Sequence, residues 1–496
     1  MPFAFTLPTT SATNLDEFFV STSHPSLILT ATTHRSVLRD ALKKHKRLTP
    51  ASQASHLSTV QDAFISYLPF VLLIYESISG QRLSQVERID LRQTKELLTE
   101  WRCTLSSSIP GREPARVKIK GIHNELAFVL QTLAYTSTLQ SRTHLLTVYT
   151  FTSPSSEQRA APISTGMKYL LEAQSVHAYV SSLPHIDANP QPADITPSTA
   201  SALASLALAE ATLVVVMKDD PYAAVVAEDR NKQSKDWMIS APSIPKVRAH
   251  LFARLCLAAA DHAAKAKGLI GGSGSAGKID DDLIKYTSDF RRMARAKAAR
   301  FLGIDAEIGG QAGEGIAWLR GAKKELGMSA DEDDAGKRKG LKGLKQTWAE
   351  KREDRKIEKG GEGWGMDAGR LEEARVIEWL EAKWVKANDM VSYISAAKLC
   401  NRLRLTVAQI NVQAVPSFEP LIASMPSGRE YHSPKPYTPP SLDPDVLARL
   451  RAPPDPNERA FTGDEDDSGN EGGTRVDPVG AFPGTSGQYD ASNTYY

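Results

Sequence analysis

The chain has 496 residues, with 60 Lys and Arg against 58 Asp and Glu and a formal net charge of +2. This near balance argues against a dedicated nucleic-acid binder, which would carry a strong basic excess. Three widely spaced cysteines fit a reduced intracellular protein without disulfides or a cysteine metal site. We find no apolar run of about eighteen residues and no signal-like N-terminus, so the sequence predicts no membrane span and no secretion.

The N-terminal part reads as a short strand followed by helices. Phe3–Leu7 alternates apolar and small or polar residues and predicts an edge strand that Pro8 ends. Helical periodicity follows over Ser36–Leu48, Ser52–Tyr75 and Leu83–Glu96. The first helix is basic at its C-terminal end, where cations suit the helix dipole, and its predicted inward residues are Val37, Leu38, Ala41 and Leu42.

The stretch from Leu97 to Tyr149 organises the rest of the chain. Leu97–Thr104 and the alternating Arg116–Lys120 predict a two-stranded antiparallel ribbon near residues 97–120, with Val117 and Ile119 on one face. A ribbon of two strands is marginal alone and needs a support. The following helix, capped by Asn124 and apolar over most of its first half, provides that support.

The remainder is predicted to be helical, with strand-like alternation nearly absent after the ribbon. Helices are expected over Ser164–Leu183, from Thr196 to before Pro221, from Pro245 to about Gly268, over Ile279–Leu302 and over Ile316–Leu326. Such a succession of helices with short breaks favours a mainly α solenoid or bundle. No fixed sequence period is present, so a consensus repeat array is not indicated.

The C-terminal third changes composition several times. Residues 330–365 form a charged excursion, and Asp367–Asp389 returns to an apolar helical stripe. Residues 416–454 are rich in proline and are expected to be extended along a surface. The last stretch, 455–496, has nine acidic and two basic residues and is expected to be disordered. We therefore expect one domain over 1–454 and an acidic tail.

No catalytic residue, cofactor-binding residue or metal ligand rises above background. Gly272–Lys278 has the glycines and lysine of a phosphate loop, but Ile279 stands where Ser or Thr would hold magnesium, so a flexible loop is the better interpretation. The histidines show no paired ligand spacing, and no nucleophile elbow is present. A hydrolase with a nucleophile dispersed among helices and a purely structural helical array both remain open as alternatives.

A helical protein without catalytic chemistry is typically a binding surface. We predict a groove between helices that accepts an amphipathic partner helix through apolar anchors. Ser201–Lys218 is a candidate wall, because its apolar residues cover more of its circumference than a simple surface helix needs. The alternative is that all of these residues belong to the core.

Several long segments carry a family resemblance: His34–Leu48, Glu100–Trp101 with Ser106–Pro114, Lys218–Tyr222, Pro245–Ala258 and Ser427–Pro440. In these segments the chain resembles the PalC family of fungal ambient-pH regulators, members of the wider Bro-one domain group that includes the scaffold Alix. The resemblance implies a boomerang-shaped helical domain with a small sheet and stacked helix pairs. It also implies a non-enzymatic adaptor without cofactor or nucleic acid.

The partners come from the same resemblance. Similar proteins dock the C-terminal amphipathic helix of an ESCRT-III core subunit in a concave apolar patch. In fungi this assembles a complex in which a calpain-like protease processes the transcription factor PacC at alkaline pH. The expected location is therefore cytoplasmic, with recruitment through partners to cortical sites of the plasma membrane or to endosomes. A general ESCRT-associated endosomal sorting adaptor is the alternative.

Carried over helix by helix, the patch has Leu213 on its first wall and Val225 and Val226 on the next. The aromatic residue that the family pattern expects on the first wall is absent, since Leu213 is followed by valines. A second departure is the extra segment Val391–Gln409. Its ends can encode splice signals, so we hypothesise a retained intron, with a genuine extra helix as the alternative.

Overall fold

A computed structural model of the chain describes residues 1–80, 89–106, 114–150, 156–184, 192–230, 247–271, 279–328, 365–400 and 413–452. The chain divides into two units, Met1–Arg451 and Ala452–Tyr496. The predicted phosphate-like loop, most of the charged excursion and the acidic tail 455–496 lie outside the described residues.

The first unit begins with a short 3-10 turn, Leu15–Glu17, and the helical pair α1 (Pro25–Arg47) and α2 (Pro50–Ser79). Two small antiparallel sheets accompany this pair: β1 (Phe19–Ser21) with β2 (Leu91–Gln93), and β3 (Leu98–Arg102) with β4 (Arg116–Lys120). The second sheet is the predicted ribbon, so that prediction is confirmed. Both helices start with proline at the first turn, where its missing N–H is harmless.

The ribbon is fixed to the helices by a buried charged group. Arg35 of α1 donates to the Glu125 carboxylate of α3 (Ile122–Thr150) over 2.9 Å, and the Trp101 indole of β3 donates to the other Glu125 oxygen over 2.7 Å. The Trp101 ring also stacks on Phe128 with centroids 5.2 Å apart. These contacts give the marginal two-stranded ribbon the support it requires.

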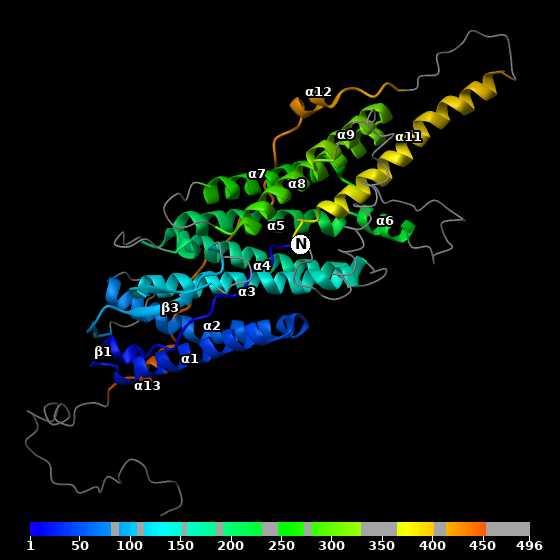
Figure 1. Ribbon diagram of the computed structural model, residues 1–496. Helices are drawn as coiled ribbons and strands as arrows, with labels where there is room; N and C mark the ends of the chain where they lie inside the picture. The colour runs from blue at the N-terminus through cyan, green and yellow to red at the C-terminus, as the bar shows by residue number, and fades with distance from the viewer. Residues whose placement is uncertain are drawn as a thin grey trace, which may run out of the picture. The chain divides into compact units, whose positions relative to one another are not determined.

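Long helices follow in chain order, and each long helix packs on the long helix before it (Figure 1). They are α3 (Ile122–Thr150), α4 (Ser156–Ser182), α5 (Pro197–Asp219), α7 (Ala249–Gly271), α8 (Asp281–Ile308), α9 (Ala312–Glu325) and α11 (Arg370–Cys400). The short α6 (Tyr222–Arg230) lies between α5 and α7 in the chain and packs on α11. A 3-10 turn, Ala193–Ile195, precedes α5. The predicted mainly α fold class is confirmed by this architecture.

The proline-rich segment is extended for most of its length but contains two short helices, α12 (Phe418–Ala423) and α13 (Pro444–Arg449). Its extended part lies on the long helices. Arg254 of α7 exchanges hydrogen bonds with it, donating to the Ser427 carbonyl over 3.1 Å and accepting from the Arg429 amide over 3.0 Å. Further along, the Tyr437 ring lies 5.4 Å from that of Tyr179.

Two helices, α2 and α5, are long and apolar enough to cross a membrane by length and composition alone. However, 61% and 78% of their most apolar windows are buried inside the protein. We therefore interpret both as core helices, which are apolar on most sides when neighbours cover them.

Several local predictions are wrong for identifiable reasons. Phe3, Phe5 and Leu7 are buried as the alternation suggests, but residues 3–7 form no strand, because the Phe3 amide donates to the Glu210 side chain over 2.8 Å. Part of the helix predicted over Leu83–Glu96 is instead strand β2, since Leu91–Gln93 pairs with β1; residues 81–88 lie outside the described residues.

Other errors concern helix starts and faces. Helix α1 begins at Pro25 rather than at Ser36, and Val37 is 53% exposed rather than inward. Asn124 lies inside α3, and its side chain donates to the Lys120 carbonyl over 2.8 Å instead of capping the helix. Helix α11 continues to Cys400, across the first half of the segment Val391–Gln409. That this segment is a retained intron stays a prediction.

Candidate functional site

Helix α5 carries the residue that the sequence places on the first wall of the binding patch. Thr196 caps α5 by accepting from the Thr199 amide, and Pro197 occupies its first turn. The helix packs between α4 and α7. Its N-terminal half is almost entirely buried, whereas Leu213 and Met217, one turn apart near its C-terminal end, are only partly buried. These two side chains face a cavity.

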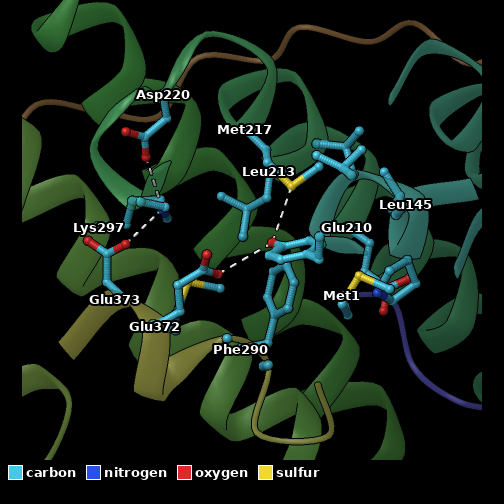
Figure 2. A pocket seen from close by; sticks show the side chains of 18 of the residues that line it. Met1, Leu145, Glu210, Leu213, Met217, Asp220, Phe290, Lys297, Glu372 and Glu373 are labelled. Atoms are coloured by element: carbon cyan, nitrogen blue, oxygen red, sulfur yellow. Dashed lines mark hydrogen bonds and ion pairs between the residues drawn. The ribbon is translucent and has the colours of Figure 1, made fainter. Parts of the chain in front are cut away.

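The cavity measures about 360 Å³ and is open to solvent on one side. It is formed by segments that are far apart in the sequence: the N-terminal Met1 and Pro2, the C-terminal ends of α3 and α5, the start of α6, the middle of α8, and the start of α11 (Figure 2). One part of its wall is apolar and consists of Leu145, Val148, Leu213, Val214, Met217, Phe290 and Met293. Another part is charged and consists of Asp220, Lys297, Glu372 and Glu373.

The three predicted patch residues fall in different environments. Leu213 lines the cavity, with its side chain pointing into it (Figure 2). Val225 is half-buried on α6, and Val226 is 3% exposed and packs in the main core. The residues of α6 that line the cavity are Ala223 and Ala224 instead. The structure therefore brings α5 and α6 together at one opening but does not place the two valines in its wall.

A buried ion cluster closes the charged side of the cavity. Arg300 lies 2.5 Å from both Asp220 and Glu373, and Lys297 lies 2.7 Å from Glu373 and 3.2 Å from Asp220. Burial alone would raise the pKa of Asp220, but Arg300 and Lys297 outweigh that effect and hold it below its usual value. The cluster fixes the C-terminal end of α5 and the start of α11 to α8.

Two further carboxylates at the cavity, those of Glu210 and Glu372, have pKa values above the ordinary value of a Glu side chain. Burial raises the pKa of Glu210 to about 7, although hydrogen bonds from Tyr286 and from the Phe3 amide oppose the shift. Burial also raises the pKa of Glu372, whose carboxylate accepts from the Tyr149 hydroxyl over 3.3 Å. The cavity thus combines an apolar wall with carboxylates that are costly to ionise.

The described residues, in the cavity and elsewhere, offer little that could perform catalysis. Within them no group of three His, Cys, Asp or Glu could hold a metal ion. Burial raises the pKa of Cys256 to about 12, so its thiol is a poor nucleophile. Burial lowers the pKa of His177 to about 3, and its ring is hydrogen-bonded to Gln131. These groups have structural roles.

Sequence reasoning missed the charged half of the cavity. The sequence places Asp220 only within the family segment Lys218–Tyr222, and it assigns no role to Lys297, Arg300, Glu372 or Glu373. Charged residues on the apolar stripes of α8 and α11 are a usable signal, because such residues are rarely buried without a partner. Their partners, however, lie on other helices, and pairing them requires the tertiary structure.

Comparison with known proteins identifies close relatives. The pH-response regulator protein palC of Emericella nidulans is 41% identical over 532 aligned residues, covering 100% of both chains. The protein of the same name from Cryptococcus neoformans var. neoformans is 32% identical over 171 residues, which cover 33% of this chain and 28% of that one. No family model matches the chain.

Solved structures give a weaker likeness. An ALIX BRO1–CHMP4C complex aligns at 15% identity with a TM-score of 0.45, covering 89% of this chain and 99% of that chain. ALIX in complex with a SIVmac239 late-domain peptide aligns at 14% identity with a TM-score of 0.48, covering 92% of this chain and 52% of that one.

Proposed function

The chain belongs to the PalC family of pH-response regulator proteins, and from this premise we propose that it binds the C-terminal amphipathic helix of an ESCRT-III core subunit at the α5 cavity. It is an adaptor of the pH-response pathway and not an enzyme. In this proposal the bound subunit brings the chain to plasma-membrane cortical sites or endosomes. There it supports cleavage of the transcription factor PacC by a calpain-like protease at alkaline pH.

The observation that carries the proposal is the position of Leu213. Its side chain is partly exposed in the wall of an apolar opening, with Met217 one helical turn away. An amphipathic helix presents apolar anchors at the same one-turn spacing. A cavity of about 360 Å³ has room for a large apolar side chain from such a helix. Exposed apolar patches of this kind mark interaction sites, because binding a partner there removes apolar surface from water.

The test is binding of the full chain to a labelled C-terminal helix peptide of an ESCRT-III core subunit, measured by fluorescence anisotropy. Leu213→Asp places a charge in the apolar wall. We expect at least about 30-fold weaker binding, corresponding to the loss of an anchor of about 2 kcal/mol. A matched control is Leu29→Asp on α1, where the leucine is 60% exposed and lies outside the cavity lining.

Circular dichroism and thermal melting of both variants verify that each one folds. Normal peptide binding by a folded Leu213→Asp variant would refute the assignment of the cavity. A cellular assay then tests the pathway: cells that carry the Leu213→Asp variant should cleave PacC poorly at alkaline pH, whereas cells that carry the Leu29→Asp control should cleave it normally.

A further inference from the structure

The extended segment between α12 and α13, residues 425–443, crosses three of the long helices, and we call it the strap (Figure 1). Its contact with α7 is made at Arg254, and its contact with α4 is made by Tyr437. Between these two points the His432 ring donates to the Ala211 carbonyl of α5 over 3.4 Å. The strap therefore rests on α7, α5 and α4 through a few separate contacts.

The backbone of the strap takes no part in regular hydrogen bonding. Among the described residues, none exchanges a backbone–backbone hydrogen bond with residues 430–442. Four prolines in this stretch fix the backbone in an extended form and remove amide donors: Pro434, Pro436, Pro439 and Pro440. An extended backbone without internal hydrogen bonds is the conformation in which peptides enter the binding grooves of other proteins.

Two hydroxyl side chains of the strap, those of Ser433 and Thr438, stand directly before prolines. Both residues are exposed, and within the described part of the chain neither hydroxyl has a hydrogen-bond partner. Proline disfavours the helical conformation for the residue before it, so both hydroxyls are held on extended backbone. Proline-directed serine/threonine kinases select this pattern, an accessible hydroxyl on an extended chain with proline as the next residue.

The same dipeptide occurs elsewhere in settings that do not suit a kinase. Thr49 and Thr196 also precede prolines among the described residues, while Ser153 does so outside them. Thr49 is exposed, but its hydroxyl donates to Ser52 over 3.1 Å and its carbonyl accepts from the Gln53 amide over 2.8 Å, so it is part of the start of α2. Thr196 is 7% exposed and caps α5. Within the described residues, the extended and accessible form of the motif is therefore confined to the strap.

We propose that Ser433 and Thr438 are phosphorylation sites of a proline-directed serine/threonine kinase. In each reaction the hydroxyl oxygen bonds to the γ-phosphorus of ATP, and the bond between that phosphorus and the β–γ bridging oxygen breaks. ADP leaves, and the hydroxyl proton passes to a carboxylate base of the kinase. Neither residue lines the α5 cavity, so the proposal is independent of the partner site proposed above.

A phosphate on Thr438 should release the strap from α4. The neighbouring residue Tyr437 makes the contact, with its ring 5.4 Å from that of Tyr179. Glu172 lies two turns from Tyr179 on the same face of α4, and it adds to the effects of burial and of Tyr179 in raising the pKa of Tyr437. A phosphate carries about −1.5 to −2 charge at neutral pH, and next to an acidic residue it disrupts contacts by repulsion.

Cations of the two segments offset little of this repulsion. Lys435 is the cation nearest to Thr438 in the strap, and Lys168 is the one nearest to Glu172 on α4. Both lysines are exposed, and exposed ion pairs contribute little because water and salt screen them. The expected net effect of the phosphate is therefore detachment of Tyr437.

Phosphorylation of the full chain in vitro tests the two sites. The chain is incubated with ATP and a mitogen-activated protein kinase, a member of the proline-directed class, and mass spectrometry follows the phosphate on each residue. Synthetic peptides that span each site are the matched control, and each rate in the chain is divided by the rate in its peptide. The relative rates at Ser433 and Thr438 should exceed that at Thr49 by at least about tenfold, because Thr49 must first leave the helix start. Thr196 should stay unmodified.

Equal relative rates at Thr49 and Thr438 would overturn the assignment, because exposure and extended backbone would then not decide the site. The assignment would also fail if the kinase modified the peptides but left Ser433 and Thr438 of the chain without phosphate.

A second experiment measures the release of the strap. The variant Ser433→Ala confines phosphate on the strap to Thr438, and chymotrypsin cleavage after Leu442, which is 5% exposed, reports detachment. Phosphorylation should accelerate this cleavage on the order of tenfold, because the bond is reached only when the strap leaves the surface. The double variant Ser433→Ala/Thr438→Ala, treated with the same kinase, is the control and should be cleaved at the original rate. Unchanged cleavage after phosphorylation of Thr438 would refute the release of the strap.

Discussion

Replacing Arg300 by methionine tests whether the buried ion cluster holds α5, α8 and α11 together. The side chain of Arg300 is completely buried and contacts Asp220 and Glu373, each over 2.5 Å. Methionine keeps an unbranched apolar stem, although a shorter one, and has no charge or hydrogen-bond donor. The variant Arg300→Met therefore leaves two buried carboxylates that share one remaining cation, Lys297.

The structure sets the size of the effect. Removing one partner from a buried ion pair costs about 3–5 kcal/mol, because the other charge stays buried without compensation. Lys297 still lies 2.7 Å from Glu373 and 3.2 Å from Asp220, so it compensates part of that charge. We therefore expect a loss near the lower end, about 3 kcal/mol at neutral pH.

The loss should depend on pH in a direction that follows from the pKa shifts. In the native protein the pKa of Asp220 is held below its ordinary 3.8, so its stabilising contribution is present above about pH 4 and disappears below it. Without Arg300, only Lys297 opposes the effect of burial on Asp220, so we expect the pKa of Asp220 to rise above its unfolded value. The variant then gains stability as the pH falls and a proton replaces the missing charge. The difference from the native protein should be largest at neutral pH and shrink toward about pH 4.

Urea denaturation followed by circular dichroism measures this difference at several pH values. The variant Arg295→Met is a matched control, since Arg295 forms one partly exposed ion pair with Glu325 over 3.1 Å and should contribute less than about 1 kcal/mol. Equal unfolding free energies for Arg300→Met and the native chain, or a deficit that stays constant with pH, would refute the role given to the cluster.

Three further predictions concern other sites. A methyl group at Gly321 of α9 would lie 1.9 Å from the Phe418 ring, so Gly321→Ala should detach α12 and expose it to protease, whereas Gly268→Ala, with nothing within 4 Å, should leave the digestion pattern unchanged. Burial raises the pKa of Glu210 to about 7 from 4.5, so its contribution to stability is lost as the pH rises through this range, and Glu210→Gln should stabilise the protein by up to about 3 kcal/mol above pH 7 in urea denaturation. An unchanged or lower stability of that variant at alkaline pH would contradict this. Burial lowers the pKa of His177 to about 3 from 6.5, so the native protein should lose stability as the pH falls below about 6.5, and His177→Gln should flatten that dependence; parallel stability curves for the two proteins would count against it.

Whether a segment forms a helix or a strand could be predicted for most elements from the spacing of their own side chains. Alternation over Arg116–Lys120, the Thr196–Pro197 helix start and the apolar periodicity of α2 and α8 each have a direct cause in side-chain spacing, and these elements are present as predicted. The family resemblance also rested on the sequence alone. Leu213 on the wall of an opening was a prediction from that resemblance, and the cavity contains it.

Tertiary contacts decided the rest. Residues 3–7 alternate like a strand, but the Phe3 amide finds its partner on Glu210, so no local pattern could predict the outcome. The ion cluster joins Arg300 to carboxylates 80 and 73 residues away in the chain. The periodicity of a segment predicts which of its sides is apolar, because this property depends only on the segment's own residues. Which distant charge lies opposite depends on how the helices pack, and only the folded structure contains that information.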